Sequence, residues 1–196
     1  MANYIVGITG ASGSIYGIHL LHELCRLKHN VDLVITNAGK MVLKEEAGIS
    51  SDRELKNKLS LCNKFLRIWD NSNFEAPFMS GSNPFDALII IPCSMGKLAS
   101  ISNGISTNLL ERTADVALKE RRKLILVVRE TPLSLIHLEN MVKVTKAGGI
   151  ILPAMPAFYH HPQKIEDIID FVVAKILNLL GIKHDLLKGW RNNRNY

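Results

Sequence analysis

The sequence predicts an α/β protein, a three-layer sandwich in which helices cover both faces of a mostly parallel sheet. Two observations carry this prediction. Apolar segments of strand length alternate with segments of helical periodicity along most of the chain, which is the order that builds parallel sheets. One apolar segment, residues 87–91, is apolar at every position, as expected for a strand buried on both faces of such a sheet.

The predicted elements follow from hydrophobic periodicity and from residues that start and stop helices. Gly148 and Gly149 end one helix and Gly181 ends another. Residues 71–83 gather Asn, Ser, Gly and Pro and predict a loop that could close over a ligand. We expect strands at residues 4–8, 31–36, 65–69, 87–91, 123–128 and 150–152, and helices at 15–27, 38–47, 53–61, 107–121, 134–146 and 164–180.

Length and composition narrow the possible classes of protein. The 196 residues suit a single domain, which we place at residues 1–182, followed by a tail at 183–196 that packs on a neighbouring subunit. The net charge of +6 is dispersed and only 6% of residues are aromatic, so nucleic acid is not an expected partner. The hydrophobic fraction of 47% is high for a monomer and predicts a homo-oligomer.

The cellular compartment is predicted from features that the sequence lacks. The most apolar helix carries Asp170 and Lys175, so we expect no transmembrane span, and no signal peptide precedes the first strand. The three cysteines are widely spaced and form no Cys-x-x-Cys pair, which indicates neither a disulfide framework nor a cysteine-based zinc site. We therefore expect a cytoplasmic protein.

A glycine-rich turn between the first strand and the first helix predicts a phosphate site. Gly10 and Gly13 permit positive φ and close approach of a ligand, and the helix that follows presents free N–H groups. Gly7, Gly10 and Gly13 recur every third residue, and Ile8 occupies a position where a dinucleotide site needs glycine. Thr36 stands where such a site carries an acidic residue. A flavin or mononucleotide fits better than a nicotinamide dinucleotide.

A second strand-to-helix turn, at residues 92–97, should meet the first at the carboxyl edge of the sheet, where open α/β sheets bind ligands. Cys93 in this turn could be a nucleophile, but a buried structural thiol is favoured. Arg112 and Lys119 are seven residues apart and project about 20° apart on a helix. Both could face one anion, or both could be solvated surface charges.

Carboxylates near the same edge could move protons. Glu46 follows the second strand and could serve acid–base chemistry or simply be solvated. Arg129 and Glu130 form a candidate ion pair at a strand end, where Arg129 could hold a phosphate or a flavin carbonyl while Glu130 transfers a proton. His160 and His161 alone do not complete a metal site, so no metal is expected.

Five segments together resemble the UbiX-type flavin prenyltransferases. They are Thr9-Gly10-Ala11-Ser12-Gly13, Pro92-Cys93-Ser94-Met95, the stretch 114–122, Arg129-Glu130-Thr131-Pro132 and Pro156-Ala157-Phe158-Tyr159, in the order and spacing of that family. The resemblance implies a Rossmann-like or flavodoxin-like fold, a homododecamer, and transfer of the dimethylallyl group of dimethylallyl monophosphate to N5 and C6 of reduced FMN. It also implies that the product, prenylated FMN, serves a UbiD-type decarboxylase.

The same resemblance assigns roles to individual residues. It implies FMN contacts at Gly10, Ala11, Ser12, Thr36, Ser94, Met95, Gly96, Lys97 and Arg129, substrate contacts at Ser80, Arg112, Lys119, Tyr159 and Lys175, and catalytic roles for Ser12, Glu46, Lys119 and Glu130. Members of the family usually have Arg where this chain has Lys175, and Lys cannot make a bidentate phosphate contact. No aspartate-rich cluster for magnesium is present, which agrees with a monophosphate held by cations alone.

Two other functions compete with flavin prenylation. An FMN carrier or accessory subunit of an aromatic acid decarboxylase would keep the two turns but would not need Glu46, Glu130, Lys119 and Tyr159 together. A flavin-dependent cysteine-type decarboxylase would carry Asn in a Pro-x-Met-Asn segment, where this chain has Pro156.

Overall fold

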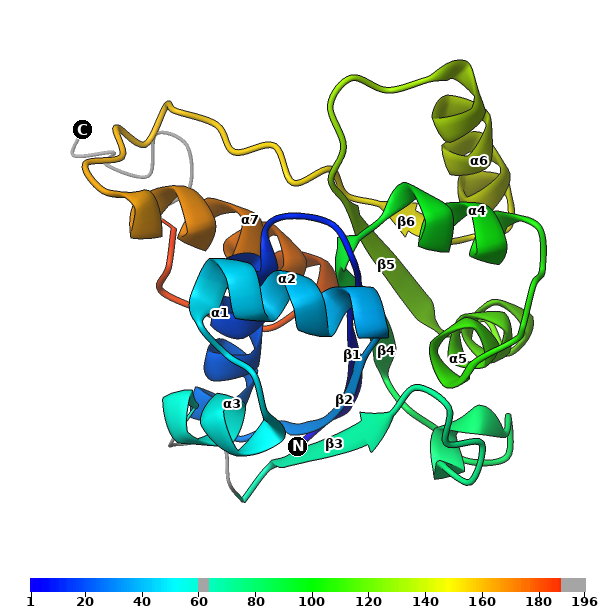
Figure 1. Ribbon diagram of the computed structural model, residues 1–196. Helices are drawn as coiled ribbons and strands as arrows, with labels where there is room; N and C mark the ends of the chain where they lie inside the picture. The colour runs from blue at the N-terminus through cyan, green and yellow to red at the C-terminus, as the bar shows by residue number, and fades with distance from the viewer. Residues whose placement is uncertain (60–63, 188–196) are drawn as a thin grey trace. The chain divides into compact units, whose positions relative to one another are not determined.

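A parallel sheet forms the centre of the structure, a computed structural model that describes residues 1–59 and 64–187. Its strand order is β3-β2-β1-β4-β5-β6, and every neighbouring pair is parallel (Figure 1). The strands are β1 (Asn3–Ile8), β2 (Asn30–Ile35), β3 (Leu66–Asp70), β4 (Ala87–Cys93), β5 (Lys123–Val128) and β6 (Ile150–Ile151). The predicted α/β class is confirmed, and the sheet is wholly rather than mostly parallel.

Helices cover both faces of this sheet, which gives the predicted three layers (Figure 1). On one side are α1 (Ser14–Arg26), α2 (Asn37–Ala47) and α3 (Asp52–Lys58). On the other are α4 (Met95–Ser102), α5 (Leu109–Lys119), α6 (Leu135–Lys146) and the short 3₁₀ helix η2 (Pro77–Met79). The fold is flavodoxin-like.

The core lies between β4 and the helices packed against it. All seven residues of β4 are buried, as the uninterrupted apolar run predicted. Leu88 and Ile90 of this strand join a cluster with Leu98 of α4 and with Leu110 and Ala114 of α5. The strand that leads to the candidate ligand edge is therefore buried at every position.

The direction in which successive strands are added to the sheet changes between β1 and β4. From β1 it proceeds to β2 and β3 on one side, and from β4 to β5 and β6 on the other. This is the topological switch point at which open α/β sheets bind ligands. The turn expected at 92–97 is shorter than predicted, because Pro92 and Cys93 belong to β4 and α4 begins at Met95. The prediction that the chain after β1 and the end of β4 converge is confirmed: Thr9 Oγ1 donates to the Pro92 carbonyl at 2.7 Å.

The chain divides into two compact units, Met1–Pro153 and Ala154–Tyr196. The sheet and α1 to α6 belong to the first unit, and α7 (Ile165–Leu180) to the second. Gly181 ends α7 with φ of 74°, as predicted. The domain boundary expected after residue 182 stays a prediction, and most of the expected tail lies outside the described residues.

Some expectations needed correction. The helix expected at 53–61 spans Asp52–Lys58 and ends with Leu59 as its C-cap. The last two expected residues, 60 and 61, lie outside the described residues. Cys25 is disulfide-bonded, which the cysteine spacing did not predict, whereas Cys93 is a buried free thiol. Burial raises the pKa of that thiol to about 12, in line with a structural rather than a nucleophilic role. None of the described helices is long and apolar enough to cross a membrane.

Candidate active site

The glycine-rich turn before α1 holds a carboxylate that belongs to the chain itself. Gly13, with φ of 107°, is the N-cap of α1. The backbone N–H groups of Gly13 and Ser14 donate to the Glu46 carboxylate at 3.0 and 2.8 Å, and the Ser14 hydroxyl donates to it at 2.8 Å. We expected the phosphate of a ligand at this helix N-terminus, but its N–H groups bind the carboxylate of Glu46 on α2 instead.

Glu46 is held as an ionised group. Burial alone would raise the pKa of this carboxyl, but hydrogen bonds from the Ser12 and Ser14 side chains and from the backbone of Ser14 and Gly13 outweigh it and lower the pKa. The sequence assigned Ser12 and Glu46 to the site separately, and the structure brings them together. Ser14 completes the contact and had no assigned role.

The turn after β5 joins the same group of residues. Arg129 Nε donates to the Ser12 carbonyl at 3.1 Å, so this guanidinium fixes the turn that holds Glu46. Within the described structure, Arg129 and Glu130 do not form the ion pair that we expected between them. Instead Glu130 Oε1 accepts a hydrogen bond from the backbone N–H of Thr131 at 3.0 Å. Glu130 is half-buried and has no cation among its described partners.

Thr36 and Ser94 both act as helix N-caps at this edge. The Thr36 hydroxyl accepts from the Gly39 N–H at 3.0 Å at the start of α2. Ser94 caps α4 by accepting from the Lys97 N–H at 3.4 Å, and its own N–H donates to Thr9 Oγ1 at 2.8 Å. Unlike α1, neither helix has a carboxylate at its N-terminus among the described residues. Both ends can therefore accept an external anion.

The first turn of α4 is open to a ligand. A Cβ at Gly96 would meet nothing within 4 Å, so a ligand can approach the backbone there. The Met95 side chain is buried in the core, which leaves only its backbone to face the site. Gly10 serves a different purpose: a Cβ there would lie 2.5 Å from the Cβ of Ala38, so it lets the first turn pack against α2. Ala11 is buried in the same turn.

Lys97 does not point its ammonium group freely into the site. Its Nζ lies 2.5 Å from Oε1 of Glu111 on α5, and both side chains are nearly buried. The sequence offered Lys97 as a cofactor contact and gave no role to Glu111. The structure instead assigns Lys97 a partner within the protein.

The two cations of α5 lie on exposed pairs. Arg112 Nη1 contacts Asp115 Oδ2 at 2.5 Å, and Lys119 contacts Glu120. The loop that contains Ser80 lies beside Lys119, because a Cβ at Gly81 would collide with the Lys119 and Glu120 side chains. The structure thus brings together Ser80 and Lys119, two of the predicted substrate residues.

The two other predicted substrate residues meet in the second unit. The ring of Phe171 lies 5.8 Å from the ring of Tyr159, and Lys175 Nζ lies 5.3 Å from the centre of the same ring. The His160 ring stacks on the Phe171 ring with a centroid distance of 5.5 Å and an interplanar angle of 16°. Phe171 was missed by sequence analysis because it reads as one of many apolar residues on the core side of α7.

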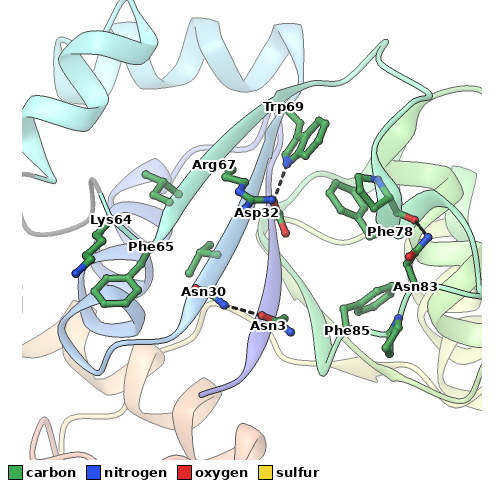
Figure 2. Close-up of a pocket in the computed structure, with 14 residues that line it drawn as sticks. Asn3, Asn30, Asp32, Lys64, Phe65, Arg67, Trp69, Phe78, Asn83 and Phe85 are labelled. Atoms are coloured by element: carbon green, nitrogen blue, oxygen red, sulfur yellow. Dashed lines mark hydrogen bonds between the residues drawn. The ribbon is translucent and has the colours of Figure 1, made fainter.

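A separate cavity of about 450 Å³ is lined by the first residues of β1 and β2, by most of β3 and by residues of the segment 77–85 (Figure 2). It contains none of the predicted site residues. Its polar groups bond to one another: Trp69 Nε1 donates to Asp32 at 2.7 Å, and Asn30 Nδ2 donates to Asn3 at 2.8 Å. The described residues also contain no group of three His, Cys, Asp or Glu side chains that could hold a metal ion.

These features define the class of protein: a parallel α/β protein with a candidate ligand site at the switch point between β1 and β4. The flavoprotein family model matches residues 2–177. Flavin prenyltransferase UbiX of Aquifex aeolicus is 50% identical over 186 residues, which cover 94% of this chain and 96% of the relative.

Solved structures agree with the sequence relatives. The crystal structure of AnUbiX (PadA1) in complex with FMN and dimethylallyl pyrophosphate has a TM-score of 0.90 and 39% identity, with 97% and 98% of the two chains covered. The dodecameric FMN-dependent UbiX-like decarboxylase from Escherichia coli O157:H7 has a TM-score of 0.89 and 39% identity, with 97% and 100% covered. The chain belongs to the flavoprotein family and, within it, to the UbiX-type flavin prenyltransferases.

Proposed function

We propose that this protein joins the dimethylallyl group of dimethylallyl monophosphate to N5 and C6 of reduced FMN and releases prenylated FMN and phosphate. One observation carries the proposal most directly. Ser12, Glu46 and Arg129 form a connected network at the switch point, with Glu130 adjacent to Arg129 in the chain. The likeness to relatives that bear the name flavin prenyltransferase supports the same function.

FMN suits the donors available at this edge. The N-terminus of α4 and the Ser94 hydroxyl can bind phosphate or flavin oxygens, and Gly96 leaves room for them. The N-terminus of α2, which Thr36 caps, is a second possible anion-binding position at the same edge of the sheet. When bound, reduced FMN supplies the nucleophilic atoms of the reaction. Arg129 orients the flavin edge and keeps the Ser12 turn in place.

The substrate phosphate would be held by cations rather than by a metal. Arg112 and Lys119 are paired with the exposed carboxylates of Asp115 and Glu120. A phosphate dianion can replace either carboxylate as the partner of the cation at a small cost in free energy. Ser80 lies in the loop beside Lys119 and adds a hydroxyl. The substrate roles of Tyr159 and Lys175 rest on the family resemblance alone. These groups stabilise the charge that develops on the phosphate as its carbon–oxygen bond breaks.

Glu130 is the best placed group to move protons. The reaction removes one proton from N5 and one from C6 and adds one to the alkene, so the flavin gains C5H8 and one proton leaves with phosphate. A half-buried carboxyl without a cation partner among the described residues can accept and return a proton. Glu46 remains ionised and, with Ser12, keeps the turn in its working geometry.

The assembly and partners extend this proposal. We propose a homododecamer that works in the cytoplasm. The exposed Leu135, Ile136, Leu138 and Val142 of α6 support self-association. The dodecameric relative supports that number of subunits. The disulfide at Cys25 removes the cysteine argument for that compartment, which rests on the family resemblance. The product would pass to a UbiD-type decarboxylase, which needs the prenylated cofactor for its own reaction.

Mass spectrometry of the flavin tests the function. Purified protein is incubated anaerobically with reduced FMN and dimethylallyl monophosphate, and the molecular mass of the extracted flavin is measured. A gain of one C5H8 unit is the expected result. FMN that binds but returns unchanged with both the monophosphate and the diphosphate would contradict prenylation and favour an FMN carrier. Turnover of a peptidyl cysteine in the same flavin-loaded sample would instead indicate a cysteine-type decarboxylase.

A further inference from the structure

Lys97 and Glu111 form a nearly buried ion pair between α4 and α5. Their Nζ and Oε1 atoms lie 2.5 Å apart, and the side chains are only 12% and 4% exposed. The other carboxylate oxygen accepts from the Thr107 N–H at 2.9 Å and from the Thr107 hydroxyl at 2.7 Å. Both oxygens of Glu111 are therefore used within the protein.

The Glu111 carboxyl of this pair is held as an anion. Burial alone would raise the pKa of Glu111, but hydrogen bonds from Lys97 and Thr107, with the charge of Lys97, lower it to about 2. A buried pair of this kind costs desolvation energy and is stable only when its remaining hydrogen bonds are satisfied. Removal of one partner leaves a buried charge without a counter-ion.

This pair differs from the two other cation pairs of α5. The side chains of Arg112 and Asp115 are 34% and 40% exposed, and those of Lys119 and Glu120 are 46% and 36% exposed. Exposed pairs are weak and can exchange their carboxylate for a phosphate. The ammonium group of Lys97 is enclosed by its own counter-ion and is not available for such an exchange.

The pair connects two parts of the site. Lys97 lies in the first turn of α4, where its N–H donates to the hydroxyl of the N-cap Ser94. Glu111 lies in the first turn of α5 and directly precedes Arg112 in the chain. Its N–H donates to Oδ1 of the N-cap Asn108 at 3.1 Å. A shift of either helix start would break the 2.5 Å contact.

We propose that Lys97 and Glu111 are positioning residues: their ion pair fixes the FMN-binding turn of α4 against the phosphate-binding helix α5, and Lys97 does not itself contact FMN. The inference rests on the proposed function for the identity of the two ligands. It revises the expected role of Lys97 from a cofactor contact to a structural link between the two binding elements.

A double-mutant cycle tests this proposal. Lys97→Met, Glu111→Gln and the double variant are compared with wild type by titration of oxidised FMN, and KM and kcat are measured for dimethylallyl monophosphate. Each single variant leaves one buried charge unpaired and should weaken FMN binding about 10-fold or more, because small displacements of binding groups are costly. The double variant has no unpaired charge, and its Gln can still accept from Thr107. Its FMN Kd and KM should return to within about threefold of wild type.

The outcomes are distinct. A double variant that binds FMN as weakly as Lys97→Met would identify Lys97 as a direct ligand and overturn the proposal. Single variants with wild-type Kd and KM would also overturn it. Circular dichroism confirms that each sample is folded at the assay temperature. If a single variant does not fold, the comparison of the double variant with wild type still tests the proposal. Glu111→Asp keeps the charge but has a shorter side chain, and it should weaken FMN binding.

A matched control and an independent readout complete the design. Lys143→Met removes an exposed lysine that bonds Asn103 at the other end of α4 at 3.1 Å, and it should leave the FMN Kd unchanged. Titration of oxidised FMN does not depend on prenylation. Wild type that binds FMN without prenylating it would refute the proposed function and leave the positioning role measurable.

Discussion

Glu46 and Glu130 belong to the same edge of the sheet, but the chain holds these two carboxylates in different ways. Glu46 accepts from two backbone N–H groups at the start of α1 and from the hydroxyl of Ser14. Glu130 accepts from the backbone N–H of the next residue. A carboxylate with many donors is fixed as an anion, whereas one with few donors can exchange a proton. This difference is the basis for the proposal that Glu46 maintains the site and Glu130 moves protons in it.

The largest effect should come from removing the exchangeable carboxyl. Glu130→Gln keeps the side-chain volume but cannot accept a proton, so the rate of flavin prenylation should fall about 10²- to 10⁴-fold. The FMN Kd should stay within about twofold of wild type, because the proposed role of Glu130 is to move a proton and not to bind FMN. Steady-state assays and FMN titration measure both quantities. Glu139→Gln on α6 is the matched control and should be neutral.

The cations of α5 should show the next largest effect. Lys119→Met removes one charged contact to the substrate phosphate and should raise the KM for dimethylallyl monophosphate about 10- to 100-fold, as expected for a hydrogen bond to a charged group. Lys56→Met on α3 controls for loss of surface charge. An unchanged KM in Lys119→Met would remove this residue from the substrate site.

The fixed carboxylate should matter for stability. Glu46→Gln removes the anion at the N-terminus of α1 and should lower the free energy of unfolding by about 1–2 kcal/mol at pH 7. Urea denaturation measures the change. Glu45→Gln, on the same helix and exposed, is the matched control.

The pH dependence of that loss has a defined sign. The pKa of Glu46 is lower in the folded protein than in the unfolded chain, so its stabilisation is complete above the unfolded-state pKa. It disappears as the pH falls through the lowered pKa. The difference in stability between wild type and Glu46→Gln should therefore be full at pH 7 and shrink in acid. A difference that grew in acid would contradict the hydrogen-bonded, ionised state of Glu46.

The smallest effect should come from the loop beside Lys119. In Gly81→Ala the new methyl group meets the ends of the flexible Lys119 and Glu120 side chains, which can move aside. Stability should change by less than about 0.5 kcal/mol. The KM for the phosphate substrate should rise about threefold because Lys119 is displaced. Equal KM values for Gly81→Ala and wild type would show that the loop does not position this lysine.

Local patterns predicted the elements but not the contacts between them. The buried run of β4, the glycine turn before α1 and the Gly181 stop of α7 are encoded by neighbouring residues, and the structure confirms all three. The bond from Ser14 to Glu46 spans 32 residues and the pair of Lys97 with Glu111 spans 14. No periodicity reports such pairs. The glycine turn was interpreted as a phosphate site, and the sequence could not show that the Glu46 carboxylate binds its N–H groups.

Single-turnover flavin analysis tests the central claim most directly. Wild type, Glu46→Gln and Glu130→Gln are each loaded with reduced FMN, mixed anaerobically with dimethylallyl monophosphate, and quenched over time for mass spectrometry of the flavin. We expect wild type to yield flavin heavier by C5H8, and Glu130→Gln to bind FMN but return it unmodified over the same period. Prenylation by Glu130→Gln at the wild-type rate would show that Glu130 does not carry the proton and would contradict the account.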